Sequence, residues 1–205
     1  MKKLILSAIA VFALSFAHAQ EESTFGFGEG NIFVEGNIDF GSTNDKNTET
    51  KTSNFNFAPK AGYFISDNLA VGLGLDFGSN KADKAEEAGK ETETSTVGFG
   101  AFARYYFLEL GERFKTYGEF GIGYETANDK IADVKTNTFR AKATLGINYF
   151  VTENFAINFA LADILSYTSA KEDVDGAKAE NKFGFEVGQF NNFFTTAQFG
   201  LTYKF

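Results

Sequence analysis

The stretch Val97–Phe107, VGFGAFARYYF, alternates without a break between two kinds of side chain. A period of two belongs to a β-strand, in which successive side chains point to opposite faces of the sheet. The segment therefore predicts a strand with one apolar face and one mixed face. The apolar face carries Val97, Phe99, Ala101, Ala103, Tyr105 and Phe107, and the mixed face carries Gly98, Gly100, Phe102, Arg104 and Tyr106.

The same alternation recurs along the chain in seven more segments, which begin near residues 32, 55, 69, 115, 139, 155 and 193. Their connections are alternately short and long. Tight turns are expected at 66–68, 110–112 and 152–154, and long polar links at 43–52, 79–95, 127–136 and 168–192. Residues 31–205 therefore predict an all-β domain, an eight-stranded antiparallel up-and-down barrel, and residues 20–30 form a short N-terminal segment before it.

The N-terminus has the pattern of an export signal. Lys2 and Lys3 precede an apolar run from Leu4 to Ala17, and Ala17-His18-Ala19 provides small residues for cleavage before Gln20. Residues 1–19 are therefore expected to be a signal peptide. Its removal takes away two lysines and no acidic residue, so the net charge falls from −8 to −10, which disfavours nucleic-acid binding.

The distribution of charge indicates which face of the barrel points outward. A water-soluble ligand-binding barrel would enclose its apolar face, whereas a membrane barrel turns it toward lipid. Here the mixed face combines glycine, which weakens a water-exposed strand, with charges of both signs, and the interior of an eight-stranded barrel is just wide enough for side chains to fill. We therefore predict a lumen charge network of Glu35, Asp39, Lys60, Asp76, Arg104, Lys115, Glu119, Glu125, Arg140, Lys142 and Lys204.

The apolar face has the features of a lipid-facing band, with little charge and with aromatic residues at both ends. One girdle is expected by the short turns (Tyr63, Tyr105, Phe107, Tyr149, Tyr203 and Phe205) and one by the long links (Phe40, Phe77, Tyr124, Phe139 and Phe193). Asp163 is an exception with lipid-facing parity, for which we expect a rim position or a bulge that turns it inward. Pro59 interrupts the second strand and predicts an irregularity or bulge there.

Together with the terminal stretch FGLTYKF (199–205), these features resemble a bacterial outer-membrane β-barrel protein of the OmpA/OmpX-like, porin-like family. The resemblance covers about residues 30–205. It implies location in the outer membrane of a Gram-negative bacterium, in contact with outer-membrane lipid and lipopolysaccharide. It also implies that the barrel assembly machinery reads the C-terminal strand, here through Phe199, Leu201, Tyr203 and Phe205.

The sequence offers little for catalysis, and we expect no enzyme, no cofactor and no metal site. The chain has no cysteine, and its single histidine, His18, lies in the predicted signal peptide, so triad, thiol and histidine-metal chemistry are lacking. Glu119 and Glu125 are separated by roughly 20 Å along one strand, too far apart for a two-carboxylate mechanism. The glycines of FGFGEGN (25–31) lack the strand-then-helix context of a phosphate loop, and KEDVDGAKAE (171–180) lacks calcium-loop spacing.

The residues leave two functional classes open. In the favoured one, a monomeric barrel with a charge-paired, largely closed interior displays its outer loops for surface or envelope interactions, including a possible extracellular ligand. The alternative is a small porin-like channel for ions or small solutes. A third class, uptake of apolar ligands, would need an apolar lumen or a lateral opening, and the inward positions are mainly polar. The last long link, residues 168–192, contains Phe183, Phe185, Val187 and Phe190. We hypothesise that these residues extend a hairpin above the membrane, whose edge binds a partner by strand addition.

Overall fold

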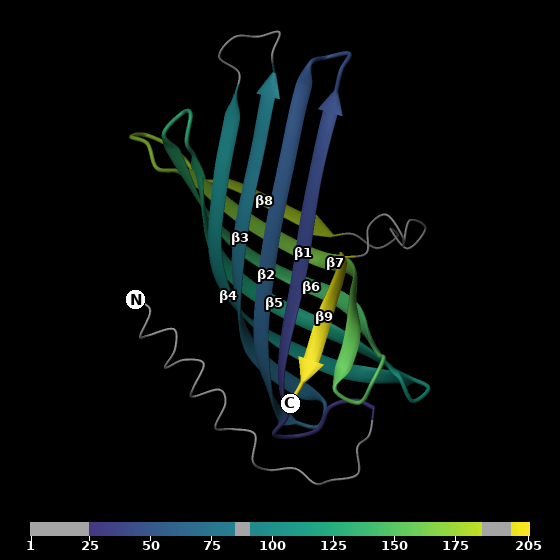
Figure 1. Ribbon diagram of the computed structural model, residues 1–205. Helices are drawn as coiled ribbons and strands as arrows, with labels where there is room; N and C mark the ends of the chain where they lie inside the picture. Colours follow the sequence, from purple (N-terminus) through teal and green to yellow (C-terminus); the bar gives the residue numbers. More distant parts are fainter. Residues whose placement is uncertain (1–24, 85–90, 186–197) are drawn as a thin grey trace, which may run out of the picture.

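The computed structural model describes residues 25–84, 91–185 and 198–205, all drawn in colour in Figure 1. The predicted signal peptide, Phe193, Val187 and Phe190 lie outside these ranges. Within them, no helix has the length and apolar character needed to cross a membrane. The strands are β1 (Ile32–Asp45), β2 (Thr50–Ser66), β3 (Leu69–Lys84), β4 (Thr92–Leu110), β5 (Phe114–Asp129), β6 (Val134–Phe150), β7 (Phe155–Glu172), β8 (Glu180–Phe185) and β9 (Gln198–Lys204).

The strands form one antiparallel sheet that closes on itself. Each strand from β1 to β7 pairs with the next along the chain, and β9 closes the ring by pairing with both β7 and β1. The segments β8 and β9 occupy successive stretches of the same edge of β7, opposite 165–170 and 155–160. They therefore belong to one wall position, and the eight-stranded up-and-down barrel predicted from the alternation is confirmed.

The two ends of the barrel differ in the way the sequence predicts, with short turns at one end and long hairpins at the other (Figure 1). The turns at 67–68 and 111–113 are tight. At the opposite end the strands continue much further than expected, so that most of the predicted long links are strand. The link 43–52, for example, shrinks to 46–49 between β1 and β2. The reason is that cross-strand pairing continues beyond the apolar band through polar residues, which the apolar alternation could not mark.

The orientation of the two faces is as predicted. Outward residues are exposed, as shown by Phe40 at 82% and Leu73 at 69%, whereas Arg104 on the inward face is 0% exposed. Strands of 14 to 19 residues in β1–β7 exceed the roughly 9 to 11 that a bilayer crossing needs. The excess length stands at the hairpin end, beyond the outward apolar residues.

Two irregularities that the sequence pointed to have different outcomes. The pairing of β6 with β7 shifts register twice, between Ala143 and Thr144 and between Leu145 and Gly146, and Asp163 thereby lies opposite inward-facing Thr144. The bulge expected at Asp163 is confirmed. At Pro59 the pairing of β2 with β3 is interrupted without a change in register. A missing N–H accounts for this gap, and the bulge suggested there is absent.

The buried core lies inside the barrel toward the short-turn end. Its apolar members are mainly aromatic: Phe33, Phe64, Ala70, Phe102, Tyr106 and Tyr117. Inward glycines make room for these rings. A Cβ on Gly62 would lie 2.3 Å from the Phe33 ring, and one on Gly146 would lie 2.2 Å from the Tyr117 ring. Large and small inward residues thus fill the narrow lumen together.

Candidate functional site

The guanidinium of Arg104, on β4, is the hub of the buried polar residues in the lumen. Its Nη1 and Nη2 donate to Oε2 and Oε1 of Glu35 on β1 at 2.8 and 2.9 Å. Its Nε and Nη2 donate to Oε2 of Glu119 on β5 at 2.8 and 2.6 Å. All three side chains are almost fully buried. The planar fork of donors allows one arginine to clamp two carboxylates, which a lysine could not do in this geometry.

A second cation completes this group. Lys60 on β2 places its Nζ 2.6 Å from Oε1 of Glu119. We call Glu35, Lys60, Arg104 and Glu119 the ionic layer; it has two positive and two negative charges and is therefore neutral. Buried charge is tolerated only when it is paired and hydrogen-bonded, and every member of the ionic layer meets this condition.

Uncharged polar groups extend the ionic layer to the far wall of the barrel. Thr202 Oγ1 donates to Glu35 Oε2 at 3.0 Å, and Asn148 Nδ2 donates to Thr202 Oγ1 at 3.3 Å. The Tyr106 hydroxyl in turn donates to Asn148 Oδ1 at 2.9 Å. The chain of hydrogen bonds therefore returns to β4, next to Arg104, after passing through β9 and β6.

The aromatic rings around Arg104 supply the remaining walls. Its Cζ lies 4.2 Å from the centroid of the Tyr117 ring and 5.1 Å from that of Phe33, distances at which a cation is attracted to a ring face. Asn158 on β7 donates to the Tyr117 hydroxyl at 2.8 Å. Seven of the eight wall positions thus contribute a polar or charged side chain to this level, and β3 contributes small residues such as Ala70.

The other predicted network residues lie in separate groups. Toward the hairpin end, Arg140 pairs with Glu125, Lys142 with Asp163 at 3.3 Å, and Asp39 accepts a hydrogen bond from Asn54. Asp76 on β3 lies across Gly98 from Glu125. Arg140 is 55% exposed and Lys142 is 44% exposed, so water reaches this half of the lumen.

At the short-turn end, Lys115 pairs with Glu109 at 2.8 Å, and Lys204 Nζ donates to the Gly26 carbonyl oxygen at 2.8 Å. The inward charges therefore form three levels along the barrel, of which the ionic layer is the buried one. Sequence reasoning did not place Asn148, Asn158 or Thr202 among the site residues. All three residues occupy inward-facing positions of their strands, and this pattern could have identified them.

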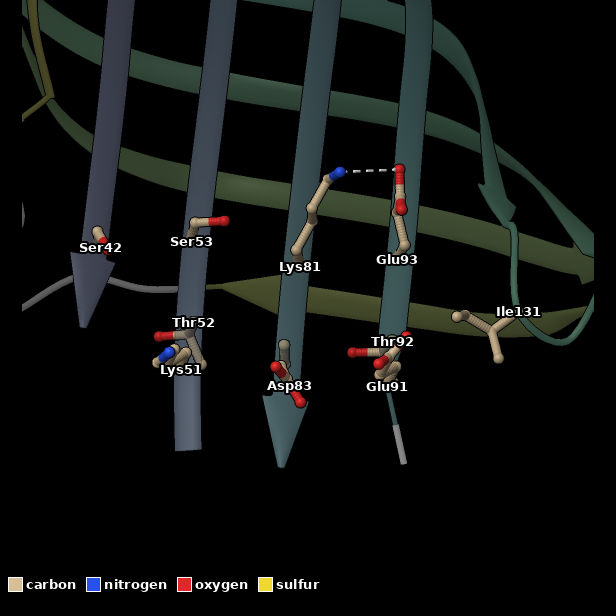
Figure 2. A pocket seen from close by; sticks show the side chains of 11 residues that line it. Ser42, Lys51, Thr52, Ser53, Lys81, Asp83, Glu91, Thr92, Glu93 and Ile131 are labelled. Carbon is tan, nitrogen blue, oxygen red and sulfur yellow. Dashed lines mark ion pairs between the residues drawn. The ribbon is translucent and has the colours of Figure 1, made fainter. Parts of the chain in front are cut away.

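A second feature is a shallow hollow on the outer face of the hairpin end. Ser42, Ser53, Lys81 and Glu93 form a row across β1 to β4, and Lys51, Asp83 and Glu91 form the next row toward the strand ends (Figure 2). Glu93 is shared between Lys81 at 3.2 Å and Lys130 at 2.6 Å. Mixed, exposed charges of this kind suit a polar partner and contribute little to stability.

The C-terminal residues named from the sequence form the outward row of β9. Phe199, Leu201, Tyr203 and Phe205 are all exposed, with Tyr203 and Phe205 in ring contact at 4.7 Å. In the described ranges, no group of three or more histidine, cysteine, aspartate or glutamate side chains is arranged to hold a metal ion. What the lumen offers chemically is a set of paired, hydrogen-bonded charges.

Comparison with known proteins agrees with the geometry. The sequence matches the family described as "Outer membrane protein beta-barrel domain" over residues 4–205. No curated protein sequence matches the chain. Among solved structures it is similar to outer membrane protein OprG of Pseudomonas aeruginosa, with 17% identity and a TM-score of 0.51, over 88% of this chain and 98% of that one.

Two further solved structures have lower TM-scores. Outer Membrane Protein W of E. coli is 16% identical with a TM-score of 0.46, over 87% of this chain and 99% of that one. Neisserial surface protein A is 17% identical with a TM-score of 0.42, over 85% of this chain and 96% of that one. The family match over almost the whole sequence carries the conclusion: this chain belongs to the outer-membrane β-barrel proteins and resides in the bacterial outer membrane.

Proposed function

We propose that this protein is a closed membrane anchor that displays its long β-hairpins at the cell surface. In barrels of this kind, the short turns face the periplasm and the longer connections face outward. The observation that carries the proposal is the ionic layer, in which Arg104 binds Glu35 and Glu119 across the lumen. A small solute or ion would have to break these contacts in order to pass.

The energetics favour a closed lumen at rest. Separating Arg104 from its partners would leave a buried charge uncompensated, at a cost of about 3 to 5 kcal/mol by analogy with broken buried pairs. The eight-stranded wall leaves little room for water beside the side chains. Aromatic rings and paired charges fill the section of the lumen at Arg104.

The alternative function is a small porin-like channel, and the water-exposed charges of the outer half, such as Arg140 and Lys142, favour it. Conductance of the purified protein in planar bilayers separates the two functions. A closed anchor is expected to give no steady events above leak. Steady open events from the unmodified protein would overturn the proposal in favour of the channel.

Matched variants make the same experiment informative about the ionic layer. Glu119→Gln removes a clamped carboxylate from the buried layer, whereas Glu125→Gln removes one from the water-exposed half. If the ionic layer is the barrier, conductance events are expected to increase in the Glu119 variant and to stay at leak in the Glu125 variant.

We further infer that the outer surface contacts phosphorylated lipid, including lipopolysaccharide. On four strands, the outward aromatic residue nearest the hairpin end is followed by two outward polar residues. A small polar residue lies two positions closer to the hairpin end, and a lysine lies four positions closer. The triplets are Phe55, Ser53 and Lys51 on β2; Phe77, Ser79 and Lys81 on β3; Phe139, Asn137 and Lys135 on β6; and Tyr167, Ser169 and Lys171 on β7. This order places ammonium groups where lipid headgroups begin.

Thermal unfolding in two kinds of vesicle tests the lipid contact. Anionic lipid or lipopolysaccharide is expected to raise the melting temperature above that in zwitterionic vesicles, and changing Lys51, Lys81, Lys135 and Lys171 to glutamine should remove this increase. Changing Lys46 and Lys178, near the hairpin tips, serves as the control. An equal loss in both variants would contradict a contact specific to the four lysines.

The outward row of β9 supports a proposed role in assembly. We expect the barrel assembly machinery to read Phe199, Leu201, Tyr203 and Phe205, which form the exposed apolar outer face at the end of the closing strand. Phe205→Ser should lower the amount of barrel in the outer membrane while leaving refolding into detergent unchanged. Phe107→Ser, an outward aromatic on β4 near the same end, is the control, and equal losses would contradict the role.

The hollow on β1 to β4 shares Lys51 and Lys81 with the proposed headgroup contact, and it is also the part of the display surface that best suits a polar extracellular ligand. The strand-addition hypothesis receives less support. Phe183 and Phe185 on β8 pair with Tyr167 and Leu165, which face outward, so they continue the apolar surface of the barrel.

We infer a monomeric protein without enzymatic activity, nucleic-acid partner or cofactor. Light scattering in detergent tests its monomeric state.

A further inference from the structure

The segment 25–31, FGFGEGN, folds back under the short-turn end of the barrel before β1 begins. The Gly30 N–H donates to the Phe64 carbonyl at 2.9 Å, and the Phe64 N–H donates to the Asn31 carbonyl at 2.9 Å. Asn31 also closes a local turn, because its Oδ1 accepts from the Gly28 N–H at 2.8 Å. The segment is therefore a defined structure attached to the end of β2.

The ring of Phe27 lies over the buried aromatic core. Its centroid is 4.6 Å from that of Phe64, in a stacked arrangement, and 5.1 Å from those of Tyr106 and Phe150. Phe33 is 5.8 Å away. These four rings come from β2, β4, β6 and β1, on different sides of the barrel, so one side chain covers the periplasmic opening.

The rim of the segment is fastened to three separate parts of the same end. Lys204, from the closing strand, donates to the Gly26 carbonyl. The Glu29 N–H donates to Asp67 Oδ1 at 3.1 Å, and the guanidinium of Arg113 lies 4.3 Å from the centroid of the Phe25 ring. Asp67 and Arg113 belong to two of the short turns. These rim contacts are partly exposed and individually weak, so the packing of Phe27 and the two backbone hydrogen bonds to Phe64 supply most of the attachment. None of these contacts belongs to the strand pairing that closes the barrel, and we therefore expect the segment to open as a local unit.

The backbone of the segment 25–31 needs a glycine at position 26. Its φ is +131°, a conformation that favours glycine, and a Cβ at this position would lie 2.9 Å from Lys115 Cε. The glycine that sequence reasoning excluded from phosphate binding therefore has a conformational role. It lets the chain pass close to Lys115, which is itself paired with Glu109.

We propose that residues 25–31 form a removable stopper, which controls access of periplasmic water and small solutes to the lumen below the ionic layer. The lumen then has two barriers in series, one formed at its mouth by Phe27 and the rim contacts and one formed by buried charge. This inference adds a second barrier to the proposed closed anchor, and it does not require that the ionic layer itself stay closed.

Thiol accessibility tests the stopper directly, because the chain contains no cysteine. Ala156 on β7 is inward, 0% exposed and paired with Phe150 and Thr202. We would introduce Ala156→Cys and measure its rate of reaction with a small, charged methanethiosulfonate in detergent. Adding Phe27→Ala is expected to raise the rate by roughly tenfold or more, since reaction follows the population of the open state.

Phe114→Ala, which truncates an outward aromatic residue at the same end, is the matched control and should leave the rate unchanged. A double variant, Asp67→Ala with Arg113→Ala, loosens the rim without removing the ring and should give a smaller increase. The proposal is overturned if the parent thiol already reacts as fast as an exposed one, or if Phe27→Ala has no more effect than Phe114→Ala. Both variants keep the same route from the hairpin end, so the difference between Phe27→Ala and Phe114→Ala reports on the periplasmic mouth alone. This difference is a separate readout from the bilayer conductance that tests the closed anchor.

Discussion

At the scale of single residues, Arg104 illustrates how the lumen is stabilised. Its five donors face Glu35, Glu119 and the Tyr106 hydroxyl, and its flat faces meet aromatic rings. A side chain with this many partners is hard to replace, because each carboxylate left behind remains buried without a counter-charge.

We expect Arg104→Met to lower the free energy of unfolding by about 3 to 5 kcal/mol, the cost of breaking a buried ion pair. The chain has no tryptophan, so urea unfolding in detergent is followed by circular dichroism or by gel mobility. Arg140→Met, which breaks the half-exposed pair with Glu125, should cost less than about 1 kcal/mol. Equal losses for the two variants would show that burial of the pair is not what matters.

Neighbouring strands approach each other so closely at Gly72 that a larger residue does not fit there. A Cβ on Gly72 would lie 2.2 Å from the Ala61 carbonyl oxygen and 2.4 Å from Phe102 Cζ, whereas Gly118 has nothing within 4 Å. We expect Gly72→Ala to destabilise the barrel by roughly 1 to 3 kcal/mol through overpacking, measured by the same unfolding assay. Gly118→Ala should be close to neutral, and a destabilised control would point to backbone effects instead.

At the scale of elements, bulges in β7 turn a carboxylate away from the lipid, although its place in the alternating sequence is lipid-facing. Two register shifts against β6 bring Asp163 opposite Thr144, which donates to its Oδ1, and within reach of Lys142. Strict alternation would have pointed this carboxylate at lipid. The bulges thus reverse the orientation of Ala162 and Asp163, while Phe159 and Leu165 on either side keep facing outward.

The direction in which one substitution changes the stability of the barrel tests the orientation of Asp163. Asp163→Leu is expected to lower stability modestly, by about 1 kcal/mol or less, because Lys142 loses a half-exposed partner. A lipid-facing carboxylate would give the opposite result, since its replacement by leucine would stabilise the barrel. Unfolding of Lys142→Met and of the double variant completes a cycle, in which the two losses should not add.

At the scale of the whole molecule, the barrel is asymmetric along its axis. Buried rings and the ionic layer occupy the half near the short turns, and water-exposed charge occupies the half near the hairpins. The short-turn end, which we propose faces the periplasm, is therefore the more densely filled end. At the other end, the strands continue as long hairpins beyond the apolar band (Figure 1), and we propose that this end contacts lipid headgroups and external partners.

Labelling of intact cells tests this orientation in the membrane. Ala132→Cys lies in the exposed connection between β5 and β6, and Glu112→Cys lies in the short turn between β4 and β5. A membrane-impermeant maleimide is expected to label the first variant on intact cells and the second only after the outer membrane is permeabilised. The reverse pattern would contradict the assignment of the two ends.

The sequence alone determined the strand pattern, the closure into eight strands and the direction of the apolar face. These features depend on period-two alternation, which is local and is set by the contrast between residues such as Phe99 and Gly98. The tertiary structure decided the rest. Which inward charges meet depends on strand stagger, which brings Arg104 to Glu35, 69 residues away, and the covering of the core by Phe27 depends on closure of the ring. Such contacts arise only when distant strands are brought together, because alternation specifies the face of each side chain and not its neighbour.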